Sequence, residues 1–255
     1  LQYSQGAIFT YATSIIIENT VPYNKNYQYD LLWGAEFKTG NSTASYMNVF
    51  EALDDDLIAA VGTYFNQSGI SYKVEIFVND VLKLTQEGIS PYLGYHTIKL
   101  NDYMPVKKGD VFKAVITSNG VPFIGLSDTR THYTENISFV SFDGQPWQDA
   151  YDLGYIACLK AYTVADDSKI INNENITVDY DGGKYFSVNV ATADGIPVVG
   201  ASVKFNINGK TTPVQTDANG IAKIKITDVP KKYTMITTYN GKSVKNTVTV
   251  NQVLK

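Results

Sequence analysis

Cysteine and histidine are scarce in this chain. Its 255 residues include one cysteine, Cys158, and two histidines. A single cysteine cannot form an internal disulfide, and these three residues show no familiar zinc-site spacing, so disulfide-stabilised and zinc-stabilised scaffolds are excluded. Long apolar runs are absent too. No window approaches the 18 apolar residues of a membrane-spanning helix, and the first residues lack the pattern of a signal peptide.

Basic residues do not outnumber acidic ones. There are 21 lysines and arginines and 25 aspartates and glutamates, which gives a net charge of -4. This balance provides no reason to expect a nucleic-acid partner. The chain is 44% hydrophobic and 18% charged, as a folded globular protein is. We expect a monomer without membrane contact. Because the chain opens on Leu1, we also expect a piece of a longer protein whose export signal or anchor lies elsewhere.

Aromatic residues are distributed unevenly. Residues 1–163 hold 15 of the 19 tyrosines, 9 of the 11 phenylalanines and both tryptophans. The next segment, "ADDSKIINNEN" (165–175), is polar and rich in turn formers, as a linker is. We therefore predict two domains, residues 1–163 and residues 164–255.

Apolar stripes with helical spacing are absent, whereas apolar and polar residues alternate in short runs. Examples are "SYKVEIFV" (71–78), "VFKAVITS" (111–118) and "KYFSVNVAT" (184–192). This period of two predicts strands. In "DDDLIAAVGTYF" (54–65) we expect a short helix or turn at residues 52–57 and then a buried strand, because Val, Thr, Tyr and Phe favour strands. The sequence predicts an all-β chain.

Two motifs characterise the second half, "GIPVVGASV" (195–203) and "TDANG" (216–220). They resemble pieces of the immunoglobulin-like repeats of surface adhesins, including the adhesin-like proteins of methanogenic archaea. The resemblance covers about residues 168–250 and implies a spacer. Alternation points Val203, Phe205 and Ile207 inward, with a turn at Asn208–Gly209 and a hairpin around Asp217–Gly220.

Some related surface domains are locked by an isopeptide bond between a lysine and an asparagine. That reaction needs both ends and an acid buried together in an apolar core, where desolvation shifts their pKa values. Lys184 and Asn246 are candidate ends. The inward positions of the middle strand supply no acid, so we expect no cross-link.

The first half contains a longer series of motifs. In chain order they are "YQYD" (27–30), "NVFEALDDDLIAAVGTYF" (48–65), "YKVEIFVND" (72–80), "GYHTIKL" (94–100), "VKKGDVFKAVI" (106–116) and "WQDAYDLGYIACLKAYT" (147–163). Their order and spacing resemble the lectin-like domain that follows papain-type cysteine peptidase domains and occurs in adhesin-like proteins of methanogens and other prokaryotes.

This resemblance implies a jelly-roll-like β-sandwich, followed here by the smaller Ig-like β-sandwich, on an extracellular cell-surface protein. It implies no particular sugar-binding residues. Four N-glycosylation sequons fit an extracellular surface; they begin at Asn41, Asn66, Asn136 and Asn175.

Cys158, the single cysteine of the chain, is a candidate nucleophile. A cysteine peptidase needs a thiolate activated by a nearby histidine. The papain-type signature C-G-S-C-W is absent, and both histidines precede Cys158, the reverse of the papain order. Alternation places Ile156, Cys158 and Lys160 on one face and Tyr155, Ala157, Leu159 and Ala161 on the other. We expect a buried, inert thiol and no enzyme.

Three other features bear on function. Alternation in "GYHTIKL" places His96 with Ile98 and Leu100, which favours a hydrogen-bonded core histidine. In "VKKGDVFKAVI" we expect only a tight turn and a strand. The acidic run at 54–56 could hold a structural calcium ion, but three adjacent acids cannot all point at one ion, which favours a solvated turn.

Ligand-binding candidates come from loops that combine aromatic and polar residues. Sugar-binding proteins stack pyranose rings on exposed aromatics and surround them with polar groups. Tyrosines on sandwiches also commonly pack across strands, and Trp147 in "GQPWQD" has a core-edge alternative. The predicted ligand-binding residues are Asp128, Arg130, His132, Tyr133, Tyr92, Tyr95 and Trp33.

Three functions remain open at this point. The preferred one is a recognition head on a spacer, with a glycan or protein on another cell surface as its partner. The second is the accessory region of a secreted papain-type (C1) cysteine peptidase, and the third is structural wall material without a ligand. Sandwich folds serve all three.

A glycan array on residues 1–165 and on residues 164–255, with and without calcium, separates these functions. We expect binding by the first piece alone, lost in Arg130→Ala or Tyr133→Ala. Absence of glycan binding by both pieces would favour the structural or peptidase-accessory function.

Overall fold

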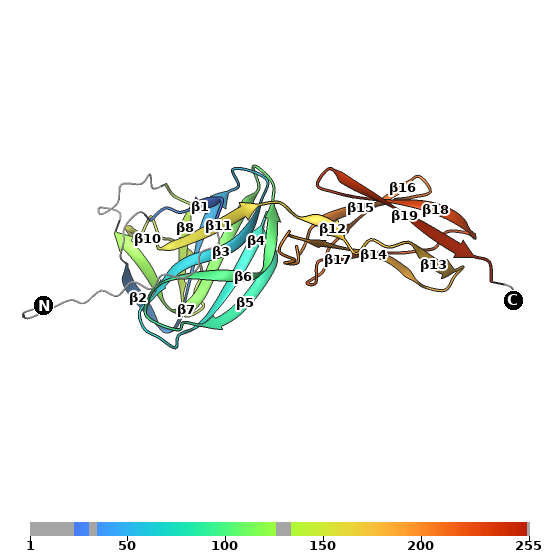
Figure 1. The fold of residues 1–255 in the computed structure, drawn as a ribbon. Coiled ribbons are helices and arrows are strands. Elements are labelled where there is room, and N and C mark those ends of the chain that lie inside the picture. Colours follow the sequence, from blue (N-terminus) through green and yellow to red (C-terminus); the bar gives the residue numbers. More distant parts are fainter. Residues whose placement is uncertain (1–22, 31–34, 126–133, 254–255) are drawn as a thin grey trace, which may run out of the picture.

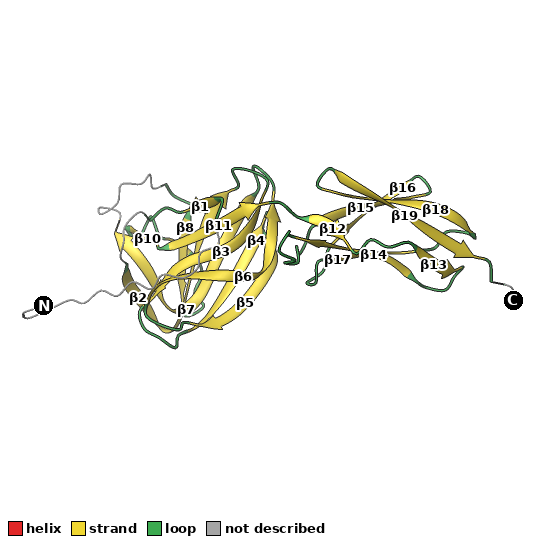
Figure 2. Ribbon diagram, in the orientation of Figure 1, coloured by secondary structure: helices red, strands yellow, loops and turns green. Residues whose placement is uncertain are grey.

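The computed structural model describes residues 23–30, 35–125 and 134–253, and this part of the chain contains strands and no helix (Figures 1 and 2). The all-β prediction is confirmed. The strands are β1 (Lys25–Tyr27), β2 (Glu36–Glu51), β3 (Asp56–Phe65), β4 (Ser71–Val78), β5 (Val81–Ile89), β6 (Gly94–Val106), β7 (Val111–Gly125), β8 (Ser138–Phe142), β9 (Gln148–Asp149), β10 (Tyr155–Ala157), β11 (Leu159–Ala165), β12 (Lys169–Ile171), β13 (Ile176–Asp179), β14 (Tyr185–Ala191), β15 (Ser202–Ile207), β16 (Lys210–Gln215), β17 (Ile221–Lys225), β18 (Lys231–Tyr239) and β19 (Lys242–Asn251).

Two sheets form the first sandwich. One has four strands in the order β1-β11-β3-β6; the other has seven, in the order β5-β4-β7-β2-β8-β9, with β10 pairing with β7. All of these pairs are antiparallel. The predicted buried strand within 54–65 is β3, and the residues before it form a turn, not a helix.

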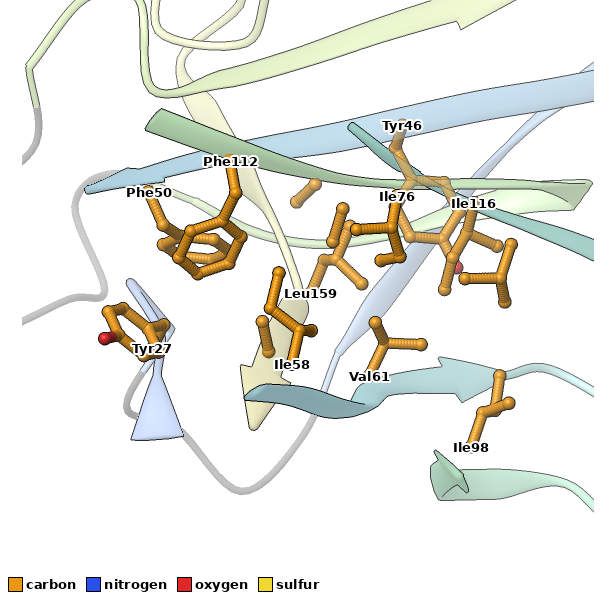
Figure 3. Packing of buried hydrophobic residues seen from close by; sticks show 14 of the residues in the cluster. Tyr27, Tyr46, Phe50, Ile58, Val61, Ile76, Ile98, Phe112, Ile116 and Leu159 are labelled. Atoms are coloured by element: carbon orange, nitrogen blue, oxygen red, sulfur yellow. The ribbon is translucent and has the colours of Figure 1, made fainter. Parts of the chain in front are cut away.

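The core of the first sandwich lies between these two sheets. Figure 3 shows Ile76 and Ile116 of the seven-stranded sheet opposite Ile58, Val61 and Ile98 of the four-stranded sheet. At one end, the rings of Tyr27, Phe50 and Phe112 form a cluster with centroids 5.1–5.9 Å apart. The alternation of apolar residues along each strand supplies one apolar face per sheet, and packing these faces together buries both.

The chain changes sheets at Cys158. Strand β10 ends at Ala157 in the seven-stranded sheet, and β11 begins at Leu159 in the four-stranded sheet. Buried polar side chains bind the three carbonyl groups at this crossing. Asn48 Nδ2 donates to Ala157 O (3.2 Å) and Leu159 O (2.8 Å), and Thr63 Oγ1 donates to Cys158 O (3.1 Å). These bonds compensate for burying backbone groups away from water.

The predicted faces of this segment are confirmed. Tyr155, Ala157, Leu159 and Ala161 belong to the main core, whereas Ile156 and Cys158 pack in a separate small cluster. Lys160 lies on the face of Cys158, where its ammonium group forms a buried ion pair with Asp30 (2.6 Å). A buried charge of this kind is tolerated because it is paired.

The second pair of sheets follows β11. Three strands pair in the order β12-β14-β17, and five pair in the order β13-β19-β18-β15-β16. Val203, Phe205 and Ile207 point inward as predicted. The predicted turn between β15 and β16 is also present, with positive φ at Asn208 (50°) and Gly209 (77°).

The predicted hairpin around Asp217–Gly220 is wrong. The turn is present, because Asp217 Oδ1 accepts hydrogen bonds from the backbone N–H groups of Asn219 (2.9 Å) and Ile221 (3.0 Å). However, β16 and β17 belong to different sheets. The turn therefore carries the chain across the sandwich, a difference that turn residues alone do not encode.

The two pairs of sheets lie end to end (Figure 1), and residues of both share a contact. Leu57, Ala59 and Tyr103 of the first pair belong to one apolar cluster with residues of the second pair, and Tyr103 forms a parallel β-bridge with Val198. Lys107 Nζ also donates to Asn240 Oδ1 (2.7 Å). No sheet within the described residues mixes strands from before and after residue 165. The predicted boundary at 163/164 falls inside β11 and stays a prediction.

Replacing Asn48 with Ala should lower the free energy of unfolding by about 2–4 kcal/mol, because two buried carbonyl groups lose their donor. Urea unfolding followed by tyrosine and tryptophan fluorescence measures this change. Asn26→Ala, at an exposed position of β1, is the control and should change stability by less than about 0.5 kcal/mol. A loss below about 1 kcal/mol in Asn48→Ala would contradict the role of Asn48 at the crossing.

Candidate functional site

Most of the predicted ligand-binding residues lie outside the described residues. These are Trp33, Asp128, Arg130, His132 and Tyr133. Their assignment to a binding site therefore stays a prediction.

Tyr92 lies beside His96. The two rings stack with centroids 4.1 Å apart, and His96 Nε2 donates to the carbonyl oxygen of Tyr92 (2.7 Å). His96 is 7% exposed, and its ring meets Phe65 edge to face. The prediction of a hydrogen-bonded core histidine is confirmed. Because His96 covers one face of Tyr92, that face is not open to a ligand.

Tyr95 belongs to a tyrosine cluster on the outer face of the four-stranded sheet. Its hydroxyl shares a hydrogen bond with the hydroxyl of Tyr162, and its ring meets Tyr64 edge to face at 5.1 Å. Gly62 leaves the space for this ring, since a Cβ atom there would collide with the Tyr95 hydroxyl. Burial, followed by the effect of Tyr162, raises the pKa of Tyr95. Tyr95 thus packs across strands, the alternative recognised from the sequence.

Cys158 has the environment of an inert thiol. Its side chain is 1% exposed, and burial, followed by the charge of Asp30, raises the pKa of the thiol above its ordinary value. A nucleophilic cysteine needs the opposite shift and a base beside it. His96, the histidine that the structure describes, hydrogen-bonds to Tyr92 instead.

The three adjacent aspartates are engaged by two lysines, Lys25 and Lys107. Asp54 pairs with Lys25, Asp55 accepts from Lys107 Nζ, and Asp56 is buried and accepts from Lys25 Nζ, Asn24 and Thr163. The carboxylates therefore do not converge on one point. Within residues 23–30, 35–125 and 134–253, no group of three His, Cys, Asp or Glu side chains could hold a metal ion.

The outer face of the seven-stranded sheet carries an apolar hollow. In β4, Val74 and Ile76 point into the core, so Glu75 and Phe77 point outward. In the register of the sheet, Glu75 lies opposite Val115 of β7, and Val115 lies opposite Met47 of β2. One row of outward side chains thus crosses three strands.

Trp147, which precedes β9, lines the same hollow as this row. Its side chain is 44% exposed. The hollow has a volume of about 380 Å³ and is lined by Met47, Glu75, Phe77, Asp80, Lys113, Val115 and Trp147. This volume lies within the range of small-ligand sites. We call it the Trp147 hollow.

Charged groups surround the apolar residues of the Trp147 hollow. Lys113 pairs with Asp80 at 2.5 Å, and Glu75 pairs with Lys73 at 3.0 Å. The hollow therefore offers an aromatic surface together with carboxylates that can accept hydrogen bonds.

The sequence analysis missed most of this hollow. From the sequence, the strand with Lys113 and Val115 is assigned to architecture alone, and Trp147 is a possible sugar-stacking aromatic with a core-edge position as the favoured alternative. Alternation in "SYKVEIFV" did place Glu75 and Phe77 on one face. The sequence does not reveal that β4, β7 and β2 are neighbours in one sheet. Nor does it reveal that the segment before β9 places Trp147 beside them.

A model of the lectin-like domain family matches residues 26–163, more than half of the chain. The chain belongs to the lectin-like domain family. Both sheets of the first sandwich, and the Trp147 hollow, lie within the matched region, apart from the first residue of β1 and the last two residues of β11. This finding confirms the resemblance drawn from the motifs between residues 27 and 163.

Several solved structures show partial similarity to the chain. One contains the cysteine protease and lectin-like domains of Cwp84, a surface layer associated protein of Clostridium difficile. It is 18% identical with a TM-score of 0.46, and the match covers 56% of this chain and 36% of that one. The chain thus corresponds to about a third of that Cwp84 chain.

Two further structures resemble a larger share of the chain. The fibronectin(III)-like modules of Clostridium thermocellum CbhA are 13% identical with a TM-score of 0.26, covering 80% of this chain and 88% of that one. A Ca²⁺-stabilised adhesin of an Antarctic bacterium is 14% identical with a TM-score of 0.22, and the match covers 86% of this chain and 51% of that one. No curated protein matches the sequence. The described residues include no helix that could span a membrane.

Cys158 in the lectin-like domain should resist thiol reagents. In the native protein at pH 8 we expect no reaction with DTNB over an hour, because the thiol is buried and its pKa is raised. In urea, one equivalent should react within minutes, which serves as the control for thiol content. Rapid reaction of the native protein would contradict a buried, inert cysteine.

Proposed function

We propose that the lectin-like domain binds carbohydrate in the Trp147 hollow and acts as the recognition head of an extracellular adhesin-like protein. The observation that carries this proposal is the combination of an exposed tryptophan, an apolar floor and carboxylates within one hollow of about 380 Å³.

The chemistry of a pyranose ring matches these groups. One face of the ring is rich in C–H groups and packs on aromatic and aliphatic surfaces such as Trp147, Phe77 and Met47. The hydroxyl groups at the edge of the ring need hydrogen-bond partners, and the carboxylates of Glu75 and Asp80 can accept from them. Burying a sugar there therefore leaves few hydroxyl groups without a partner.

The remainder of the chain fits the role of a spacer. Residues 168–250 resemble Ig-like repeats of adhesin-like proteins of methanogens, and we propose that this second sandwich carries the head away from a cell surface. The partner would be a glycan or a protein on another cell. We propose an extracellular location and no catalytic activity for this chain, in keeping with the inert environment of Cys158.

The motif resemblance also supports a second function. The same sandwich could hold a papain-type peptidase domain on its substrate or on the cell wall. Sequence preceding Leu1 distinguishes the two functions, because a peptidase would place its cysteine and histidine motifs there.

Trp147→Ala tests the proposed site. On a glycan array, we expect the full chain to bind, and Trp147→Ala to weaken its best signal at least tenfold, because a central aromatic side chain commonly dominates binding energy. Tyr151→Ala is the matched control. Tyr151 is a nearby aromatic residue, 40% exposed, that does not line the hollow.

Arg130→Ala on the same array tests the polar loop predicted from the sequence. Loss of binding in Arg130→Ala with full binding by Trp147→Ala would move the site from the hollow to that loop. Absence of binding to any glycan would overturn the proposed function.

A further inference from the structure

A second hollow lies on the same outer face of the seven-stranded sheet. Its volume is about 740 Å³. It is lined by thirteen residues of β4, β5, β7, the loop before β4 and the irregular part of β2, among them Ser42, Lys73, Glu87, Thr117 and Asn119. We call it the Asn119 hollow. Two of its lining residues reach the core, because Ile70 belongs to the core cluster and Tyr72 packs against it. The proposed function does not use this hollow.

The two hollows are neighbours along the strands. Lys73 lines the Asn119 hollow, Glu75 lines the Trp147 hollow, and their side chains form an ion pair of 3.0 Å between the two. On β7, Val115 lines one hollow and Thr117, the next outward residue, lines the other.

Ser45 of β2 lies beside Thr117 of β7, and the two hydroxyl groups share a hydrogen bond of 2.8 Å. From Lys113 to Asn119, β7 advances about 20 Å at the usual rise of a strand. The two hollows thus follow one another along β7, with the Lys73–Glu75 ion pair between them, and we call them together the groove.

The charges of this groove favour a neutral ligand. Both lysines among its lining residues already pair with carboxylates, Lys73 with Glu75 and Lys113 with Asp80. Glu87 adds a further negative charge beside Lys73. An anionic polymer would meet this carboxylate without gaining an uncommitted cation, so repulsion would oppose its binding.

We propose that the groove binds an extended, neutral, β-linked oligosaccharide along its whole length, with one sugar on Trp147 and later units in the Asn119 hollow. This inference rests on the proposed function and specifies its ligand. Two hollows that follow one another along a strand suit a chain of equatorially linked pyranoses, which is itself extended. The polar residues at the far end, Thr117 and Asn119, can both donate and accept hydrogen bonds to hydroxyl groups.

Chain length and far-end substitution test this proposal. Isothermal titration of the full chain with cello-oligosaccharides and chito-oligosaccharides of two, four and six units should show affinity rising at least tenfold from two to six units in one series. Asn119→Ala should weaken the six-unit ligand about threefold to tenfold, the effect of one lost hydrogen bond, and leave the two-unit ligand unchanged. Asn26→Ala, on the opposite sheet, should change neither.

Other outcomes separate this proposal from the proposed function. Equal affinity for two and six units, with loss in Trp147→Ala but not in Asn119→Ala, would overturn the extended groove and keep the carbohydrate site. Tighter binding of an acidic uronic-acid oligosaccharide of equal length would overturn the neutral ligand. No binding by either neutral series, with a positive array signal for another glycan, would overturn the ligand class alone.

Discussion

The first sandwich depends on the crossing at Cys158, where the chain leaves one sheet for the other. A chain that passes between two sheets leaves one ladder of hydrogen bonds before it joins the other, so buried backbone groups at the crossing need side-chain partners. Asn48 and Thr63 supply the missing donors from the interior faces of β2 and β3. Because both residues stand on strands of the opposing sheets, the same contacts hold the sheets in register. The apolar core packs around a crossing whose three carbonyl groups are hydrogen-bonded.

The outer face of the seven-stranded sheet follows from the same packing. Once Val74, Ile76, Ala114 and Ile116 are buried in the core, the pleat turns their neighbours outward. Glu75, Val115 and Met47 therefore lie in one row without any contribution from loops. A site built on strands is held by the ladder hydrogen bonds of the sheet and by the core beneath it. The floor of the groove proposed above is of this kind, whereas Trp147 and the loop before β4 lie outside the strands.

The contact between the two pairs of sheets combines apolar and polar groups. Leu57 and Tyr103 share a cluster with Val198, and Lys107 connects Asp55 to Asn240. The acidic turn at residues 54–56 thus serves two purposes: Asp54 and Asp56 hold Lys25 of β1, while Asp55 holds Lys107 beside the second pair of sheets. Charges that suggested a calcium site or a solvated turn in the sequence are used as ion-pair partners.

By itself, the sequence determined which residues face inward along each strand, because alternation with a period of two is local. It also determined the all-β class, the lectin-like family and the buried state of His96 and Cys158. Tertiary structure alone decided which strands are neighbours. The turn at Asp217–Gly220 looks like a hairpin in the sequence yet crosses between sheets, and Trp147 joins Phe77 and Met47 through strand order. The long-range packing of whole sheet faces determines which strands are neighbours, and no local pattern of residues encodes this choice.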